Sequence, residues 1–233
     1  ISELWAHDRA EFFSTDPGAA MFIDQVLASA WQEPTASRIY ITCASSAGDS
    51  LSQWRGYAGT SGFAIAFRID SNLWFGAPDR IVDGLMNGIS MPYWFEVVYE
   101  PRQQDELIRS FFQWLSLLPA SMREPSALWA ARLGVSPLPA LLKHNGFRDE
   151  REVRWIGAEL SPISADPQPG EKRHLPVGAY ASSSGEVNLS KLPVAEVQGG
   201  PTCGPDAEAN VLHWLAEAGH EQVSVSRSQI PFR

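Results

Sequence analysis

The stretch FRDEREVRW, which ends at Trp155, constrains the fold of this chain more than any other segment. Side chains of a β-strand alternate between its two faces. Read as a strand, the stretch places Glu150, Glu152 and Arg154 on one face. Val153 and Trp155 then point to the opposite face. Such a strand needs a sheet with one face packed on an apolar core, and we expect Val153 and Trp155 to be buried there while Glu152 faces a cavity.

The charged face of this strand carries two carboxylates beside a guanidinium. Carboxylates this close raise one another's pKa, whereas a neighbouring Arg lowers it. Unusual charge clusters with perturbed pKa values often mark functional sites. We interpret Glu150 and Glu152 as the wall of a polar site. An edge strand that carries only surface ion pairs is the alternative.

The order of the predicted elements favours one α+β domain over residues 1–233. Several strands follow one another directly, and helices interrupt them in the middle of the chain, unlike the regular βαβ alternation of a doubly wound sheet. We therefore expect mixed, mainly antiparallel sheets with inserted helices, a loop-rich segment at 162–185 and an ordered tail at 228–233. Because the chain begins at Ile1 without a Met, we expect its N-terminal part to be incomplete. Apolar periodicity, capping residues and alternation predict helices at 17–32, 103–118 and 205–218, a Pro-interrupted helical region at 124–143, and strands at 38–44, 62–69, 91–99, 150–160, 194–197 and 223–226.

Charge and composition argue against several classes of protein. The formal net charge of -9 argues against a broad face for duplex DNA, because phosphate contacts need clustered Lys and Arg. Cys43 and Cys203 have neither metal-ligand spacing nor the pattern of a disulfide framework, which indicates reduced thiols in a cytoplasmic protein. No apolar run approaches the roughly 20 residues of a membrane span.

A second constellation, SQWRGY, lies between two predicted strands. Arg55 can bind a phosphate or carboxylate in bidentate fashion. Trp54 and Tyr57 can stack on a flat ring. The alternative is a buried aromatic corner in which Arg55 pairs with Glu150 or Glu152. Hydroxyl side chains just upstream could add polar contacts to a ligand: Thr42, Ser45 and Ser46.

Together these motifs resemble a bacterial family, the domain of unknown function numbered twenty-nine seventy-one. The resemblance spans about residues 40 to 233 and implies no activity. Members of this family open with an aromatic-rich first strand, and 4–8 resembles the end of that strand. The motifs that carry the resemblance are DSLSQWRGY at 49–57, GFAIAF at 62–67, KHNGFRDEREVRW at 143–155 and SQIPFR at 228–233.

The order of a Ser/Thr-rich strand, an aromatic segment and a late Glu-x-Glu strand also resembles ADP-ribosyltransferases. These are compact α+β proteins that bind NAD between two small split sheets, and some act as bacterial toxins or defence effectors. The resemblance implies that Glu152 stabilises the ribosyl cation formed when NAD loses nicotinamide, and that Glu150 orients or deprotonates the acceptor. Residues implied to contact NAD are Arg55 or Arg154 at the pyrophosphate, Tyr57 or Trp54 at nicotinamide, and Thr42, Ser45 and Ser46 on the hydroxyl-rich strand.

Two other functions stay open alongside this one. One is a non-catalytic module that binds a ligand or a partner. The other is a metal-dependent hydrolase using Asp149, Glu150 and Glu152, which is disfavoured because no His or further Asp lies at ligand spacing. In each case a shared site is expected, with Arg55, Tyr57 and Arg154 converging on the two glutamates.

Overall fold

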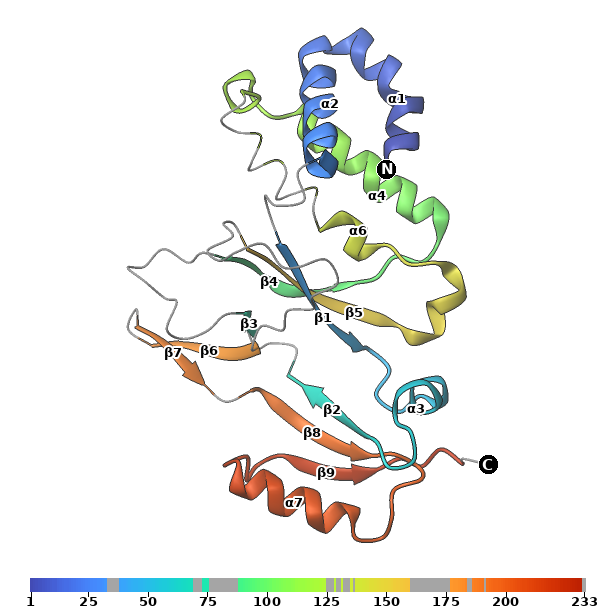
Figure 1. Ribbon diagram of the computed structural model, residues 1–233, viewed down its shortest axis with the longest axis vertical. Helices are drawn as coiled ribbons and strands as arrows, with labels where there is room; N and C mark the ends of the chain where they lie inside the picture. Colours follow the sequence, from blue (N-terminus) through green and yellow to red (C-terminus); the bar gives the residue numbers. More distant parts are fainter. Residues whose placement is uncertain are drawn as a thin grey trace.

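Helices and strands segregate along the long axis of the molecule, as Figure 1 shows for this computed structural model. The helices α1 (Ser2–Thr15), α2 (Pro17–Gln32) and α4 (Pro101–Ser116) lie at one end, small β-sheets follow, and α7 (Ala207–Glu217) lies at the other end (Figure 1). The architecture is α+β, as the element order predicted. Structure is described here for residues 1–32, 38–68, 73–75, 88–124, 128, 131, 135, 137–159, 177–183, 186–190 and 192–231.

The helical end is a three-helix cluster whose sequence signals are local. Asp16 caps the second helix, because the Ala19 amide donates a hydrogen bond to its Oδ1 at 2.9 Å, and Pro17 occupies the first turn. The apolar stripe of α4 buries Ile108, Phe112 and Leu115 against α1 and α2. The helices are α1 (Ser2–Thr15), α2 (Pro17–Gln32) and α4 (Pro101–Ser116).

The N-terminal helix corrects one expectation taken from the family resemblance. Residues 4–8 lie inside α1, whereas the resemblance placed them at the end of a strand. Trp5 and Phe12, two turns apart on one side of this helix, pack on each other and against the core, where the Trp5 ring contacts Phe112. This apolar face is what makes the segment a helix against α2 and α4.

The described residues form three small sheets, each of three strands, and most strand pairs are antiparallel. The exception is the parallel pair β8–β9, which α7 connects. The first sheet has the order β1 (Arg38–Ser45), β5 (Glu152–Glu159), β4 (Gly88–Glu96). The second has the order β2 (Phe63–Phe67), β8 (Val194–Gly199), β9 (Ser224–Arg227), and the third β3 (Leu73–Phe75), β6 (Val177–Ser183), β7 (Glu186–Ser190).

The strands β6 and β7 show that the predicted loop-rich segment at 162–185 is wrong in its second half. Its first half, up to residue 176, lies outside the described residues. The abundant Ser and Gly around 178–185 hid the strand pattern, because neither residue marks a buried face.

Five further helical segments among the described residues are short. They are α3 (Leu51–Tyr57), α6 (Leu138–Leu141), α7 (Ala207–Glu217) and the 3-10 turns η2 (Ala120–Met122) and η4 (Asn145–Glu150). Three of them, α3, α6 and η4, lie at the candidate site. The helix α7 ends where predicted, since Gly219 takes the left-handed conformation with φ 71. None of the described helices has the length and apolar character needed to cross a membrane.

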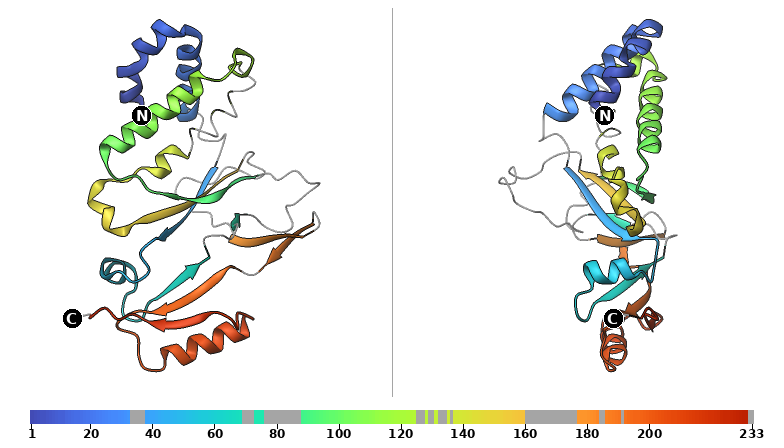
Figure 2. Two further views of the ribbon diagram at one scale, coloured as in Figure 1. Left: turned by 180° about the vertical axis from the view of Figure 1, so that it is seen from behind. Right: turned by 90° about the vertical axis from the view of Figure 1, so that its right-hand side faces the viewer.

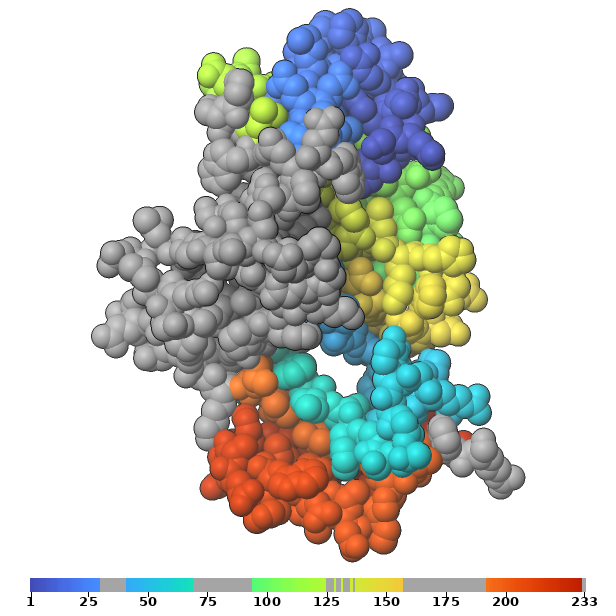
Figure 3. Space-filling view, in the orientation of Figure 1, coloured from blue at the N-terminus to red at the C-terminus, as the bar shows by residue number. Residues whose placement is uncertain are grey.

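The first two sheets follow one another along the long axis when the molecule is seen from behind or from the side (Figure 2). The space-filling view shows a hollow at this level, bordered by β1, α3 and β2 (Figure 3). Two bordering strands keep apolar side chains exposed, Ile41 on β1 and Ile65 on β2. Helix α3 therefore lies beside an opening between two sheets.

Candidate functional site

The FRDEREVRW stretch is a turn followed by a strand, and it begins the site. Glu150 ends the 3-10 turn η4, and β5 starts only at Glu152. Between them Arg151 adopts the left-handed conformation, with φ 44 and ψ 48. Ser45 Oγ donates to the Glu150 carbonyl at 2.7 Å, and the Ser46 amide donates to the Arg151 carbonyl at 2.9 Å. The prediction that Glu150 belongs to the strand is therefore wrong.

The two glutamates nevertheless meet, because Lys143 bridges them. Its Nζ donates to Glu150 Oε2 at 2.5 Å and to Glu152 Oε2 at 2.8 Å. From the next position on the same strand face, Arg154 Nε donates to Glu152 Oε1 at 2.8 Å and Nη2 donates to Oε2 at 3.0 Å. Arg154 Nη1 also donates to the carbonyl of Ala140 in α6. We call these four charged residues, Lys143, Glu150, Glu152 and Arg154, the charge network.

The charge network is balanced and largely closed to solvent. Two ammonium or guanidinium groups face two carboxylates, and Glu152 is only 7% exposed. Burial by itself would raise the pKa of Glu152, but hydrogen bonds from Arg154, Cys43 and Lys143 lower that pKa to about 2. The same contacts with Glu150 and Glu152 raise the pKa of Lys143 above its usual value despite the opposing effect of burial. Glu152 and Lys143 therefore both carry their charges at neutral pH.

The strand β1 supplies the residues next to this network. Its register pairs Cys43 with Arg154 and Ser45 with Glu152, so both lie on the face of the network. Burial of the thiol and the nearby Glu152 carboxylate raise the pKa of Cys43 to about 11, although the residue as a whole is exposed. A thiol with this pKa stays protonated at neutral pH and is a weak nucleophile. Cys43 is thus a neighbour of Glu152 rather than an activated group.

Of the three hydroxyl residues predicted to contact a ligand, one lies on the face opposite Glu152 and two bind backbone carbonyls. Thr42 pairs with Trp155, which places it on the face opposite Glu152. Ser45 and Ser46 donate their hydroxyl groups to the carbonyls of Glu150 and Arg151. They stabilise the turn that leads into β5.

The apolar face of β5 is confirmed at Trp155, which is 1% exposed and packs edge-to-face on Trp94 with ring centroids 5.9 Å apart. Val153 is only half-buried, so its predicted full burial is wrong. Glu152 is enclosed by its ion pairs instead of facing a cavity as predicted.

Helix α3 buries Trp54 of the SQWRGY motif and leaves Arg55 and Tyr57 exposed. Trp54 is 4% exposed, and its Nε1 donates to Asp49 Oδ1 at 2.6 Å. A Cβ atom at Gly200 would lie 3.1 Å from the Trp54 ring, so glycine allows the close contact between helix and sheet. Trp54 cannot offer a ring face to nicotinamide in this arrangement, which corrects that assignment. Tyr57 is 74% exposed.

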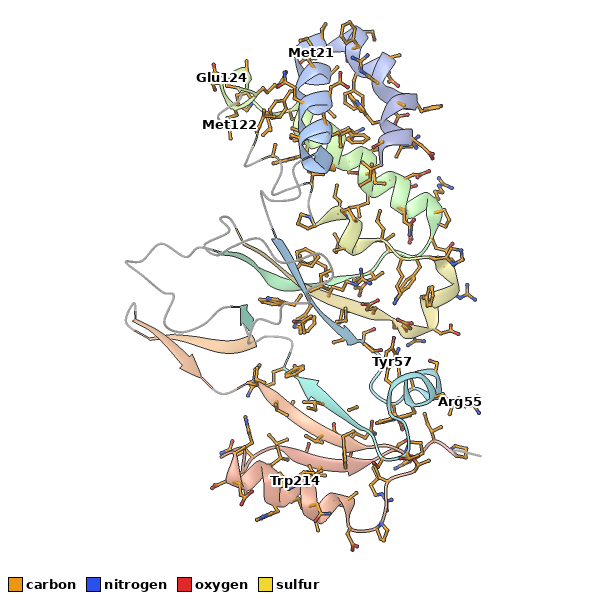
Figure 4. The ribbon with its side chains drawn as sticks, viewed as in Figure 1. Met21, Arg55, Tyr57, Met122, Glu124 and Trp214 are labelled. Carbon is orange, nitrogen blue, oxygen red and sulfur yellow. The ribbon has the colours of Figure 1, made fainter. Side chains whose placement is uncertain are left out.

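Arg55 is also exposed and extends outward from α3, away from the β1–β5–β4 sheet, as Figure 4 shows. The predicted convergence is thus met only in part: Glu150, Glu152 and Arg154 come together around Lys143, while Arg55 and Tyr57 are exposed on α3 and are not part of this cluster.

Helix α3 lies next to the 3-10 turn η4. Gln53 Nε2 donates to the Glu150 carbonyl at 3.3 Å and connects the two segments. In η4, Phe147 is 50% exposed, and Lys143 Nζ lies 5.0 Å from its ring centroid. We call the exposed side chains of Arg55, Tyr57, Phe147 and Arg148 the α3–η4 surface.

Two members of this site were missed by the sequence reasoning. Lys143 lies within a recognised motif, but its role depends on η4 bringing residues 143 and 150 together. Cys43 could have been found, because strand alternation from Ser45 places it on the same face. Within the described ranges, no group of three His, Cys, Asp or Glu side chains is placed to hold a metal ion.

One protein-family model matches residues 53–155, a segment that begins within SQWRGY and ends with FRDEREVRW. The matching model is that of the family described as protein of unknown function (DUF2971), and this segment is similar to it. The match confirms the family resemblance carried by these motifs. No curated protein and no solved structure matches the chain. All residues of the charge network and of the α3–η4 surface lie within this matched segment. The strand β1, which contacts the charge network, lies outside it.

Proposed function

We propose that this chain is a non-catalytic binding module whose α3–η4 surface holds an anionic ligand with a flat ring, such as the dinucleotide NAD. The observation that carries the proposal is the state of Glu152, the carboxylate expected to be catalytic. Both of its oxygen atoms accept hydrogen bonds from Arg154 or Lys143, and it is 7% exposed. A carboxylate neutralised in this way contributes little to the stabilisation of a cation on a ligand.

The composition of the α3–η4 surface supports a ligand that has both charge and a ring. Tyr57 is 74% exposed and Phe147 is 50% exposed, although rings of this size are usually at least partly buried. Arg55 and Arg148 provide guanidinium groups on the same two segments, within a chain of net charge -9. Guanidinium groups recognise phosphate, and exposed rings stack on bases.

Isothermal calorimetry with NAD tests the proposal directly. Replacing Tyr57 with Ala should weaken NAD binding about 10- to 100-fold, since one stacked ring contributes about 1–3 kcal/mol. Arg55→Ala should weaken it by a comparable factor, because a charge-assisted contact is lost. If NAD at millimolar concentration gives no heat of binding with the unmodified chain, the proposed ligand is wrong.

Matched controls separate these effects from general surface changes. Trp214 in α7 is an exposed ring, 58% accessible, at the opposite end of the β2–β8–β9 sheet region. Arg102 in α4 is an exposed arginine whose partner is Glu106, one turn away. Trp214→Ala and Arg102→Ala should leave the NAD affinity unchanged, and an equal loss in the controls would contradict a ring and guanidinium site on α3.

A second candidate, an NAD-consuming enzyme of the ADP-ribosyltransferase type, is favoured by one observation. Glu152 has a pKa of about 2 and is ionised at neutral pH, as a carboxylate that stabilises a ribosyl cation must be. The hollow beside β1, α3 and β2 would give NAD a place between two sheets (Figure 3). Release of nicotinamide from NAD by the unmodified chain, reduced about 10²–10³-fold by Glu152→Gln, would establish this candidate over the binding module.

A further inference from the structure

The C-terminal tail hydrogen-bonds to the carboxylate of Asp49, the residue before the N-cap of α3. Asp49 Oδ1 accepts hydrogen bonds from Trp54 Nε1 at 2.6 Å and from Ser228 Oγ at 2.7 Å. Its Oδ2 accepts from the Gln229 amide at 3.3 Å. The carboxylate therefore joins the tail to the loop before α3 and to Trp54, although Asp49 and Ser228 are 179 residues apart in sequence.

Each of the joined segments has its own anchor. The Ser228 amide donates to the Gly199 carbonyl at the end of β8, at 2.8 Å. The Gly200 amide donates to the Gly62 carbonyl at 2.9 Å, and Gly200 faces the Trp54 ring. The tail thus starts from a fixed position on the second sheet. Its prediction as an ordered segment is confirmed for the described residues 228–231.

We infer that Asp49 is a positioning residue, through which the C-terminal tail fixes the orientation of α3 and so of the α3–η4 surface; this inference rests on the proposed function. The physical link is the helix itself. Trp54 and Tyr57 are three residues apart, slightly less than one helical turn, so the rotation that buries Trp54 also sets the direction of Tyr57.

The charge of Asp49 makes the junction stronger than neutral hydrogen bonds would. Burial raises the pKa of Asp49, but hydrogen bonds from Trp54, Ser228 and the Gln229 amide outweigh burial and lower that pKa below its usual value. The carboxylate is ionised at neutral pH, and hydrogen bonds to an ionised acceptor are about twice as strong as neutral ones.

The test removes one hydroxyl group and restores it. In Ser228→Ala the tail loses its contact with Asp49 Oδ1, whereas Ser228→Thr keeps a hydroxyl at the same position. Hydrogen exchange measured by mass spectrometry should show amides of 51–57 exchanging about tenfold faster in Ser228→Ala, and nearly as slowly as the unmodified chain in Ser228→Thr. Amides of α4, which lies toward the opposite end of the molecule from the tail (Figure 1), should exchange at the same rate in all three proteins.

Asp49→Asn provides an independent variant, because it keeps the shape of the side chain and removes its charge. Both Ser228→Ala and Asp49→Asn should raise the Kd for NAD about tenfold, although neither residue belongs to the α3–η4 surface. Unchanged exchange at 51–57 in both variants would overturn the inference. Equally faster exchange throughout the molecule would also overturn it, since the tail would then contribute only to global stability.

The exchange experiment needs no ligand, so the two proposals fail separately. If NAD does not bind the unmodified chain but exchange at 51–57 responds to Ser228→Ala, the binding function is wrong and the positioning role stands. If NAD binds and neither variant alters exchange or affinity, the positioning role is wrong and the binding function stands.

Discussion

The charge network and the α3–η4 surface use similar residue types for opposite purposes. In the charge network, two glutamates are matched by a lysine and an arginine and are enclosed between β5, η4 and α6. On the α3–η4 surface, an arginine and a tyrosine of the SQWRGY motif are exposed. The difference shows that charged residues enclosed in ion pairs and charged residues exposed to solvent look alike in sequence. Only the geometry of the partners distinguishes them.

The largest loss of stability is expected at β5, the strand that carries Glu152 and Arg154 on one face and the buried Trp155 on the other. Trp155→Ala should lower the free energy of unfolding by about 3–5 kcal/mol, because it leaves a cavity where a ring that is 1% exposed packs on Trp94. Urea denaturation followed by far-UV circular dichroism measures this loss. Trp214→Ala, a truncation of a ring that is 58% exposed, should cost far less; equal losses would mean that β5 is not the packed strand.

Acid titration tests whether Glu152 braces the fold. Its pKa falls from 4.5 to about 2 on folding, so its contribution to stability is complete above about pH 4.5 and is lost as pH falls toward 2. This contribution is about 3 kcal/mol. Unfolding free energies of the unmodified chain and of Glu152→Gln, measured in urea at a series of pH values, should differ most at neutral pH and converge in acid.

The comparison with Glu152→Gln is needed because other carboxylates contribute to acid unfolding. Asp8, Asp24 and Asp49 also have lowered pKa values, owing to their own hydrogen bonds. Their contributions are common to both proteins and cancel in the difference. A difference that stays constant from neutral pH to about pH 2 would show that Glu152 is not held by the charge network.

The smallest loss of stability is expected on the α3–η4 surface. Tyr57→Ala should change the free energy of unfolding by less than about 0.5 kcal/mol, because a ring that is 74% exposed contributes little to packing. Trp54→Ala, in the same helix, should cost several times more, since that ring is 4% exposed. Similar losses of unfolding free energy for the two variants, measured by thermal unfolding, would contradict the assignment of Trp54 as buried and Tyr57 as exposed.

Local sequence signals predicted the elements of the fold well. The Asp-Pro start of α2, the apolar stripe of α4 and the glycine end of α7 are determined by residues close together in the chain. The strands β1, β2, β5, β8 and β9 also lie where alternation predicted them, apart from one or two residues at their ends.

The site was predicted less well, because its geometry depends on one unusual residue and on distant contacts. Arg151 is in the left-handed region, which few residues other than glycine adopt, and alternation cannot reveal it. Without that turn, Glu150 would continue the strand. The burial of Trp54 depends on the absence of a side chain at Gly200, a neighbour far away in sequence. No pattern within SQWRGY carries that information.

The segment β8–α7–β9 differs from the rest of the second sheet in the distance its contacts span along the chain. Its core of Val197, Val211 and Val223 lies within one continuous stretch, whereas β2 must join β8 from residues 63–67. Contacts between residues close in sequence close small loops and form quickly, while distant strand pairs form slowly. We therefore expect β8, α7 and β9 to assemble early during folding and to provide the edge onto which β2 is added afterwards.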